Sequence, residues 1–336
     1  MAELKKALIT GGGGFIGRKI VGQLLARGVD CLVIGRHNYP ELERLGVKCL
    51  IGNICDNDFV LKICSGVDTV FHTAAIAGMW GKWDDYYAVN FLGTKNIIAA
   101  CLKNQVKSLV YTSTPSVVFN GQDICGGDEN MPYAENFLCH YAKSKTMAEK
   151  AVLSAVKENG LNACAVRPHL VYGPGDPHLV PRLLDRGRKR KLKIVGSGDN
   201  LVDISYIDNV AHLHILAAAS LLSDGRAKGQ AYFIGDEEPV KLWDWINSLF
   251  EQTGLARIEK MVPAKAAYAA SGLIELLYKG LNLAKEPPMT RFVAEQLSKS
   301  HYFSHQKARE ELGYQPLVNP AQAMENLLIW IRENDI

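Results

Sequence analysis

The sequence predicts an α/β protein with a doubly wound parallel sheet and a smaller, mostly C-terminal second lobe. Short apolar segments typical of buried strands alternate with helix-like periodic segments over about 170 residues. A run of four glycines directly follows the first of these strands. From about residue 175 the alternation becomes less regular, as expected of a lobe assembled from several excursions of the chain.

Composition narrows the class of protein. The chain has 336 residues, of which 48% are apolar and 22% charged, and this balance predicts a folded chain with a large core. The apolar run after Met1–Lys6 is too short for a signal peptide, so we expect a cytoplasmic protein. The eight cysteines form no Cys-x-x-Cys pair or cluster with histidine, which predicts reduced thiols and no metal. The net charge of +3 is too small to indicate a nucleic-acid partner.

The glycine run lies between a predicted strand, residues 5–10, and a predicted helix that continues through Leu25. Gly11, Gly14 and Gly17 recur every three residues at this turn. Such glycines let the backbone approach a pyrophosphate, whose charge the helix N-terminus stabilises. The position of the turn, at the start of an alternating chain, therefore predicts dinucleotide binding.

The end of the second predicted strand, residues 30–36, indicates which dinucleotide is bound. NAD-binding proteins of this architecture place a carboxylate there for the ribose hydroxyls, but this chain has Gly35 and Arg36. A guanidinium pairs well with a 2′-phosphate, so the sequence favours NADP over NAD. The alternative is that Arg36 is an ordinary surface residue.

Further strands are predicted at 48–51, 69–75 and 108–114, and the last of these ends in three hydroxyl side chains. A helix that starts near Tyr141 would place Lys145 on the same face, four residues later. A nearby ammonium lowers the pKa of a phenol toward the working range, so this pair predicts proton transfer. The alternative is an ordinary helix surface.

The predicted lobes are discontinuous. Residues 1–174 should form the dinucleotide-binding lobe and rejoin it at about 208–240, because 231–235 looks like another strand; 175–207 and 241–336 should form the substrate lobe. Residues 260–283 are unusually apolar, with charges that exclude a membrane-spanning helix. They either pack the small lobe or form a lid for a long acyl chain, resting on a membrane surface or partner.

Several motifs together indicate a family. They are Thr10-Gly11-x-x-Gly14-Phe15-Ile16-Gly17, Asn90-x-x-Gly93-Thr94, Tyr141-x-x-x-Lys145 and Arg167-Pro168-x-x-x-Tyr172-Gly173. With them, the chain resembles an extended short-chain dehydrogenase/reductase, whose fold is Rossmann-like. Residues 110–118 and 132–133 resemble the 3β-hydroxysteroid dehydrogenase branch. Residues 78–81, 172–183, 200–209 and 290–297 resemble the 2-alkyl-3-oxoalkanoate reductases of bacterial long-chain olefin biosynthesis.

The resemblance implies roles for individual residues. Tyr141 would protonate the substrate carbonyl oxygen, Lys145 would lower the pKa of Tyr141 and hold the nicotinamide ribose, and Thr114 would hydrogen-bond the carbonyl oxygen, with Ser113 as the alternative. The expected cofactor contacts are Gly11, Gly14, Phe15, Ile16 and Gly17 at the pyrophosphate, Arg36 at the 2′-phosphate, Asn53 and Ile54 at the adenine, Ala74 and Ala75 behind the cofactor, and Pro168 at the nicotinamide. The family more often has Asp where this chain has Asn53.

The expected function is NADPH-dependent reduction of the 3-keto group of a long-chain 2-alkyl-3-oxoalkanoic acid to the 3-hydroxy acid, a step of lipid metabolism. The alternatives are a 3β-hydroxysteroid or sterol dehydrogenase and a non-catalytic protein that senses NADP. The candidates for binding the substrate carboxylate are His169, His178, Arg182 and Arg291. We expect an apolar small-molecule substrate, a homodimer, and contact with either a membrane surface or a multienzyme assembly.

Overall fold

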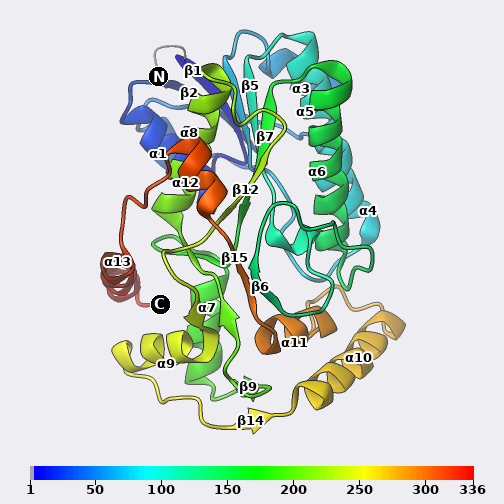
Figure 1. The fold of residues 1–336 in the computed structure, drawn as a ribbon, viewed down its shortest axis with the longest axis vertical. Helices are drawn as coiled ribbons and strands as arrows, with labels where there is room; N and C mark the ends of the chain where they lie inside the picture. The colour runs from blue at the N-terminus through cyan, green and yellow to red at the C-terminus, as the bar shows by residue number, and fades with distance from the viewer. Residues whose placement is uncertain (1–3) are drawn as a thin grey trace.

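The computed structural model describes residues 4–336, and its centre is a seven-stranded sheet in which every neighbouring pair is parallel (Figure 1). Its strand order is β12-β7-β5-β4-β1-β2-β3. The strands are β1 (Lys6–Thr10), β2 (Asp30–Gly35), β3 (Lys48–Ile51), β4 (Thr69–His72), β5 (Ser108–Thr112), β7 (Ala163–Pro168) and β12 (Ala231–Ile234). The order reverses direction between β1 and β4, and in such sheets ligands bind outside the carboxyl ends of the strands at this point. The predicted fold class is confirmed.

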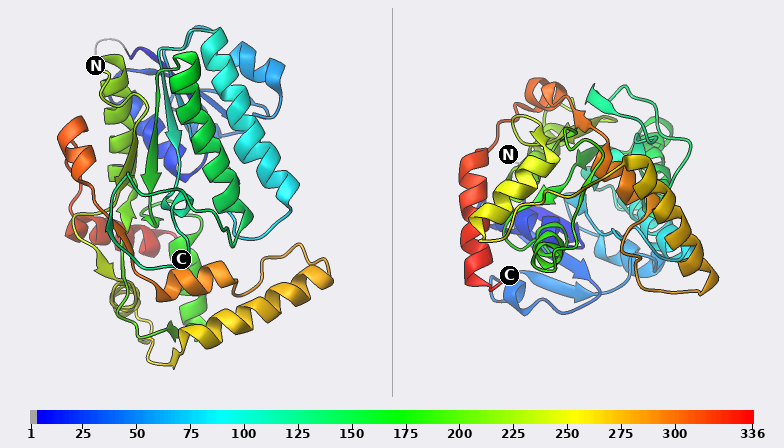
Figure 2. Two further views of the ribbon diagram at one scale, coloured as in Figure 1. Left: turned by 45° about the vertical axis from the view of Figure 1, so that its right-hand side comes forward. Right: turned by 90° about the horizontal axis from the view of Figure 1, so that it is seen from below.

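Helices cover both faces of this sheet (Figures 1 and 2). One face packs against α1 (Phe15–Leu25) and α8 (Ile207–Leu222). The other packs against α3 (Asn57–Ile63), α5 (Gly93–Lys103) and α6 (His140–Asn159). Because both faces are covered, strands such as β1 and β5 are almost continuously apolar, and this is why they were predictable. The short helices α2 (Pro40–Glu43) and α4 (Trp83–Tyr86) and a π-helical turn (Tyr87–Leu92) lie in the connections.

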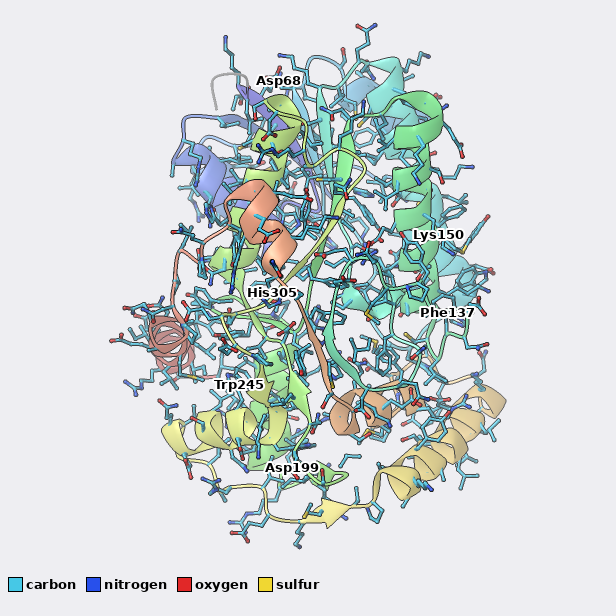
Figure 3. All side chains as sticks on the ribbon, in the orientation of Figure 1. Asp68, Phe137, Lys150, Asp199, Trp245 and His305 are labelled. Atoms are coloured by element: carbon cyan, nitrogen blue, oxygen red, sulfur yellow. The ribbon has the colours of Figure 1, made fainter. Side chains whose placement is uncertain are left out.

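The second lobe lies below the carboxyl ends of the strands in Figure 1. It contains a four-stranded sheet ordered β13-β10-β15-β6 and two short strand pairs, β11 with β8 and β14 with β9. Its strands are β6 (Ile124–Gly127), β8 (Val171–Tyr172), β9 (Ile194–Val195), β10 (Leu201–Val202), β11 (Ser205–Tyr206), β13 (Val240–Lys241), β14 (Met261–Val262) and β15 (His301–Phe303). The core of this lobe includes Trp243 and Trp245 of α9 (Leu242–Gln252), and Trp245 is labelled in Figure 3.

The helices of the C-terminal half are α7 (Leu179–Arg188), α9 (Leu242–Gln252), α10 (Ala264–Gly280), α11 (Arg291–Ser298), α12 (Gln306–Leu312) and α13 (Pro320–Glu333). Three segments cross the predicted lobe boundaries: β6 pairs with β15, β8 pairs with β11, and α12 packs against α8 and β12. The residue bounds of the two lobes therefore stay a prediction. None of the helices within residues 4–336 combines the length and the apolar character that crossing a bilayer requires.

Candidate active site

Lys145 is the best-enclosed member of the predicted catalytic group. It lies one turn after Tyr141 on α6 and is only 3% exposed. Its ammonium donates a hydrogen bond to the carbonyl oxygen of Thr112, at the end of β5, and lies 4.1 Å from the ring centroid of Tyr111. Burial lowers the pKa of Lys145 to about 7, although the nearby Glu149 carboxylate opposes this shift. The Lys145 side chain is thus held in a largely water-free position.

The pKa of the Tyr141 phenol differs from the prediction. Burial raises its pKa to about 12, and the Thr114 hydroxyl offsets this rise only in part. The expected lowering by Lys145 is wrong for this structure, because the ammonium is directed at the Thr112 carbonyl and the Tyr111 ring. Tyr141 therefore holds its proton firmly, which suits an acid that releases it only to a strongly basic oxygen.

Two hydroxyls follow β5 beside Tyr141. The Thr114 hydroxyl caps the short turn Pro115–Val117, accepting from the Ser116 amide at 3.3 Å and donating to the Ser116 hydroxyl at 3.2 Å. The Ser113 hydroxyl is buried beside the Glu149 carboxylate, whose pKa it helps to lower. Both residues line the same cavity as Tyr141, so the structure brings together Thr114 and its alternative.

This catalytic cavity has a volume of about 480 Å³ and lies between the carboxyl edge of the main sheet and the second lobe. Among the predicted site residues, Ile16, Ala75, Thr114, Tyr141, Lys145 and Pro168 line it. Much of the remaining wall is apolar and comes from the second lobe, including Leu179, Leu183, Leu192, Met289, Phe292, Val293 and Leu297. The predicted catalytic side chains thus adjoin a wall suited to an apolar ligand.

A second cavity, the adenosine cavity, has a volume of about 210 Å³ and adjoins the first through the shared residues Thr73 and Ala75. The predicted cofactor residues that line it are Gly11, Gly14, Arg36, Asn53, Ile54, Ala74 and Ala75. The Arg36 side chain is exposed and has no ion-pair partner in the described part of the chain. Two adjoining cavities along the switch point fit an elongated dinucleotide.

The glycine turn explains which residues line these cavities. Gly11 has a φ of +67°, and a Cβ there would lie 2.9 Å from the Ala74 backbone. A Cβ on Gly17 would lie 2.4 Å from the Gly11 carbonyl oxygen, so Gly17 lets α1 pack against the turn. Gly17 and Phe15 line neither cavity; Phe15 packs against the core of the second lobe instead. Their predicted contact with a pyrophosphate stays a prediction.

Sequence reasoning missed Tyr39, which lines the adenosine cavity. Its ring fills the space beside two glycines, since a Cβ on Gly35 would lie 2.2 Å from the Tyr39 hydroxyl and one on Gly13 would overlap the ring. A glycine at position 35 thus leaves room for the Tyr39 ring. It also means that the end of β2 carries no carboxylate. No sequence signal marks Tyr39, because the contact depends on how the loop after β2 folds back.

A buried ion pair supports α6, the helix that carries Tyr141 and Lys145. Glu149 lies one turn after Lys145 on α6 and is fully buried, and its carboxylate accepts hydrogen bonds from Arg167 Nε at 3.1 and 3.2 Å and from the Tyr133 hydroxyl at 2.8 Å. Burial raises the pKa of Glu149, but Arg167 together with the Ser113 and Tyr133 hydroxyls more than offsets this, so the pKa lies below its ordinary value. Glu149 follows Lys145 by four residues, as Lys145 follows Tyr141, so the three lie on one helix face. Sequence reasoning did not use this signal for Glu149.

The four carboxylate-binding candidates lie in different surroundings. His178 and Arg182 line the catalytic cavity, with Arg182 paired to Glu286 at 3.2 Å. His169 also lines it, but burial lowers its pKa well below the ordinary value, so the ring is neutral. Arg291 lies outside this cavity and is paired with Glu275 at 2.8 Å.

Arg186 is a further cation of the catalytic cavity that the candidates did not include. It lies one turn after Arg182 on α7 and donates a hydrogen bond to the Pro288 carbonyl oxygen at 3.0 Å. No carboxylate of residues 4–336 pairs with it. In the sequence, Arg186 begins a run of basic residues that extends to Lys191, and this run was its signal.

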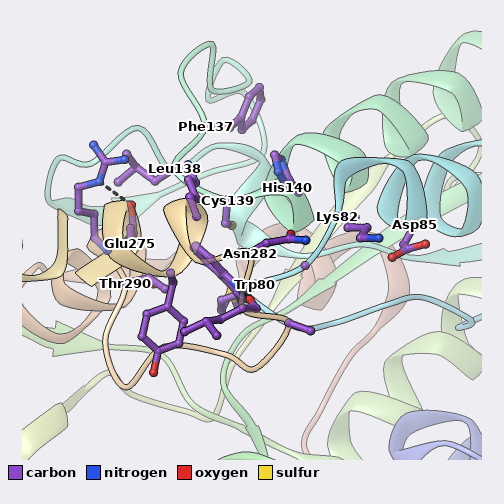
Figure 4. A pocket seen from close by; sticks show the side chains of 17 residues that line it. Trp80, Lys82, Asp85, Phe137, Leu138, Cys139, His140, Glu275, Asn282 and Thr290 are labelled. Atoms are coloured by element: carbon purple, nitrogen blue, oxygen red, sulfur yellow. Dashed lines mark hydrogen bonds and ion pairs between the residues drawn. The ribbon is translucent and has the colours of Figure 1, made fainter. Parts of the chain in front are cut away.

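A third cavity, the α10 cavity, has a volume of about 700 Å³ and is larger than the other two, yet it does not contain Tyr141 (Figure 4). It lies between α10, the loop around Trp80 and the segment that precedes α6. Met79 borders both this cavity and the catalytic one.

Comparison with models of protein families shows to which family the chain belongs. The model of the 3-beta hydroxysteroid dehydrogenase/isomerase family matches residues 8–263. The chain belongs to this family. The family is one of dehydrogenases, so the resemblance inferred from the motifs and the predicted oxidoreductase class are both confirmed.

Relatives of this family member include the 2-alkyl-3-oxoalkanoate reductase of Shewanella oneidensis, 45% identical over 97% of this chain and 86% of the relative. The enzyme of the same name from Stenotrophomonas maltophilia is 43% identical over 96% of this chain and 98% of the relative. The sterol-4-alpha-carboxylate 3-dehydrogenase of Mus musculus is 37% identical over 97% of this chain and 90% of the relative.

Several solved structures are similar to this chain in fold. The dTDP-glucose 4,6-dehydratase of Streptomyces venezuelae, solved with NAD bound, has a TM-score of 0.77 at 22% identity and covers 98% of this chain and 97% of its own. The UDP-glucose 4-epimerase of Thermotoga maritima has the same TM-score and identity, covering 98% of this chain and all of its own. The 3-beta hydroxysteroid dehydrogenase/isomerase family member thus has the fold predicted from its motifs.

Proposed function

We propose that the protein uses NADPH to reduce the 3-keto group of a long-chain 2-alkyl-3-oxoalkanoic acid to the 3-hydroxy acid, in olefin biosynthesis. The observation that carries the proposal is the catalytic cavity, in which Thr114, Tyr141 and Lys145 adjoin a largely apolar wall. Two relatives that are 43% and 45% identical over nearly the whole chain bear the name of this activity. The expected homodimer and cytoplasmic location stay predictions.

The cofactor residues fit a nicotinamide dinucleotide. Gly11 and Gly14 would hold the pyrophosphate, Asn53 and Ile54 the adenine, and Lys145 the nicotinamide ribose, from cavities that share Thr73 and Ala75. Arg36, free of other ion pairs within residues 4–336, would pair with a 2′-phosphate. When bound, the reduced nicotinamide supplies the hydride that the carbonyl carbon receives.

The side chains of the protein supply the proton that the carbonyl oxygen receives. Tyr141 donates its phenolic proton to the carbonyl oxygen as negative charge develops there, and its raised pKa keeps it protonated until then. The Thr114 hydroxyl donates a hydrogen bond to the same oxygen, and Lys145, held by the Thr112 carbonyl oxygen, would hold the nicotinamide ribose.

The substrate's two ends require different surroundings. Its alkyl chains would lie along the apolar wall formed by α7 and α11, and its carboxylate would pair with Arg186, which has no carboxylate partner in the described chain. Arg182 is held by Glu286 and His169 is neutral, so both are weaker candidates.

Carboxylate recognition is tested by comparing turnover of the hydroxy acid with that of its methyl ester. We expect the acid to react at least about tenfold faster, and Arg186→Gln to remove most of this difference, since a hydrogen bond to a charged group contributes about 1.5–3 kcal/mol. Arg188→Gln, an exposed residue of the same helix outside the cavity, is the matched control. Equal rates for acid and ester would contradict the assignment of Arg186.

A 3β-hydroxysteroid or sterol dehydrogenase is the second candidate function. It is favoured by the 37% identity to the mouse sterol-4-alpha-carboxylate 3-dehydrogenase and by the apolar wall, which also suits a ring system. A non-catalytic NADP sensor is a weaker alternative, because it has no need for Thr114, Tyr141 and Lys145 in one cavity.

The preference for NADPH depends on Arg36. We expect Arg36→Ser to lower kcat/KM for NADPH about tenfold to a hundredfold, because a charge-assisted hydrogen bond to the 2′-phosphate is lost, and to leave kcat/KM for NADH unchanged. Arg44→Ser, which removes an exposed arginine that lines no cavity described above, is the matched control. An unchanged cofactor ratio in Arg36→Ser would show that Arg36 is an ordinary surface residue.

A further inference from the structure

The outer face of α10 is apolar and uncovered. Nine residues of this helix are exposed: Lys265, Ala266, Ala269, Ala270, Leu273, Leu276, Leu277, Lys279 and Gly280. The outer α10 face is the set of seven among them that carry no charge. Its three leucines are 64–67% exposed, and Leu281, directly after the helix, is 68% exposed. Soluble chains rarely expose so many neighbouring leucines without a partner surface.

The opposite side of α10 is fastened to the protein. Glu275 is buried and accepts hydrogen bonds from the Arg291 amide at 2.7 Å and from Arg291 Nε at 2.8 Å. The Trp80 indole donates to the Leu283 carbonyl oxygen at 3.0 Å and packs edge-on against Tyr278. The α10 cavity lies on this side (Figure 4), and the helix runs along the edge of the molecule (Figure 2). The outer face is therefore held outward by specific contacts.

Exposed lysines predominate beside this face, although Glu259 and the partly exposed Glu286 lie at the two ends of the segment. Within residues 260–285 the exposed ionisable groups are Lys260, Lys265, Lys279 and Lys285. The single carboxylate of this range, Glu275, is buried against Arg291. A symmetric contact between two copies of this face would place like charges together, which is unfavourable. An anionic surface complements both the leucines and the lysines.

We propose that α10 docks on an anionic lipid bilayer, lying in the plane of the interface with its outer face among the lipid chains and its lysines at the headgroups. Helices with leucines on one face and flanking lysines bind membranes in this way. Residues 286–289, which follow α10, line the catalytic cavity, so docking would bring the entrance for an apolar substrate beside the bilayer. The docking itself does not depend on which substrate is reduced.

The test is co-sedimentation of the full-length protein with vesicles of equimolar phosphatidylglycerol and phosphatidylcholine and with vesicles of pure phosphatidylcholine. We expect binding to the anionic vesicles that is several-fold weaker on phosphatidylcholine and falls with salt. The double variant Leu273→Gln and Leu277→Gln should lower the partition coefficient about tenfold or more, because two leucines no longer enter the lipid. The double variant Lys265→Gln and Lys279→Gln should reduce the preference for anionic lipid.

The matched control is Leu45→Gln with Leu317→Gln, which removes two leucines that are 62% and 53% exposed elsewhere on the surface. It should bind as the unaltered protein does, and the melting temperature of each variant checks its folding. Absence of vesicle binding, or binding unaffected by the α10 leucine variant, would overturn the proposal. The proposal would also be overturned if sedimentation velocity shows a dimer that does not bind vesicles and that dissociates in the leucine variant. A second copy of the chain would then cover the face.

Discussion

Replacing Tyr141 by phenylalanine is expected to lower kcat about 10²- to 10⁴-fold, the range that a positioned general acid contributes. The phenylalanine ring fills the same space, but the proton for the carbonyl oxygen is lost from a cavity where Tyr141 is the acid beside Thr114. Steady-state and single-turnover rates measure the loss, and a fluorescence titration with NADPH checks that cofactor binding is kept.

The control for this variant is Tyr87→Phe. Tyr87 is partly exposed, lies in the π-helical turn before α5 and lines none of the three cavities, so its phenol should be dispensable. Turnover retained by Tyr141→Phe, with NADPH bound normally, would contradict the proton-transfer role and leave the Thr114 and Ser113 hydroxyls to be tested in its place.

Replacing Glu149 by glutamine should destabilise the fold by about 3–5 kcal/mol, because it leaves the Arg167 guanidinium buried without its counter-charge. Urea unfolding at neutral pH measures the difference. Glu158→Gln is the matched control, since Glu158 is exposed near the end of the same helix and makes no ion pair within residues 4–336; its cost should be close to zero. A loss below about 1 kcal/mol for Glu149→Gln would show that the pair is not a main support of α6.

The effect of Glu149→Gln depends on pH in a defined direction. The pKa of Glu149 in the folded protein lies below its ordinary value of 4.5. The stabilising contribution of the carboxylate is thus fully present above pH 4.5 and disappears as the pH falls through the lower, folded-state pKa. The stability difference between the unaltered protein and the variant should therefore shrink as the pH falls below 4.5, and a series of unfolding curves measured from neutral pH down into the acidic range follows it.

The dinucleotide-binding half could be predicted because its signals are local. Strands buried on both faces are continuously apolar, and Gly11 and Gly14 lie in the one turn where backbone must approach both Ala74 and the adenosine cavity. The four-residue spacing of Tyr141 and Lys145 similarly fixed a shared helix face before any tertiary contact was known.

Features that depend on distant contacts could not be predicted. Strand β6 pairs with β15, and the backbone of Ser300 bonds to Asp123 across 177 residues. The pKa of Tyr141 is set by burial under elements from both halves, so the local rule that an ammonium four residues away lowers it was insufficient. Tyr39 enters the adenosine cavity through the fold of a loop, and the exposure of the α10 leucines depends on what the rest of the chain leaves uncovered.

The most direct test of the proposed function is oxidation of a racemic long-chain 2-alkyl-3-hydroxy acid, followed at the absorbance band of reduced nicotinamide. Parallel reactions replace NADP by NAD and the hydroxy acid by a 3β-hydroxysteroid, and Tyr141→Phe serves as the inactive reference. The account predicts rapid oxidation of the hydroxy acid with NADP and little with NAD. Turnover of the steroid alone, with NAD as the preferred cofactor, would contradict it and identify a steroid dehydrogenase.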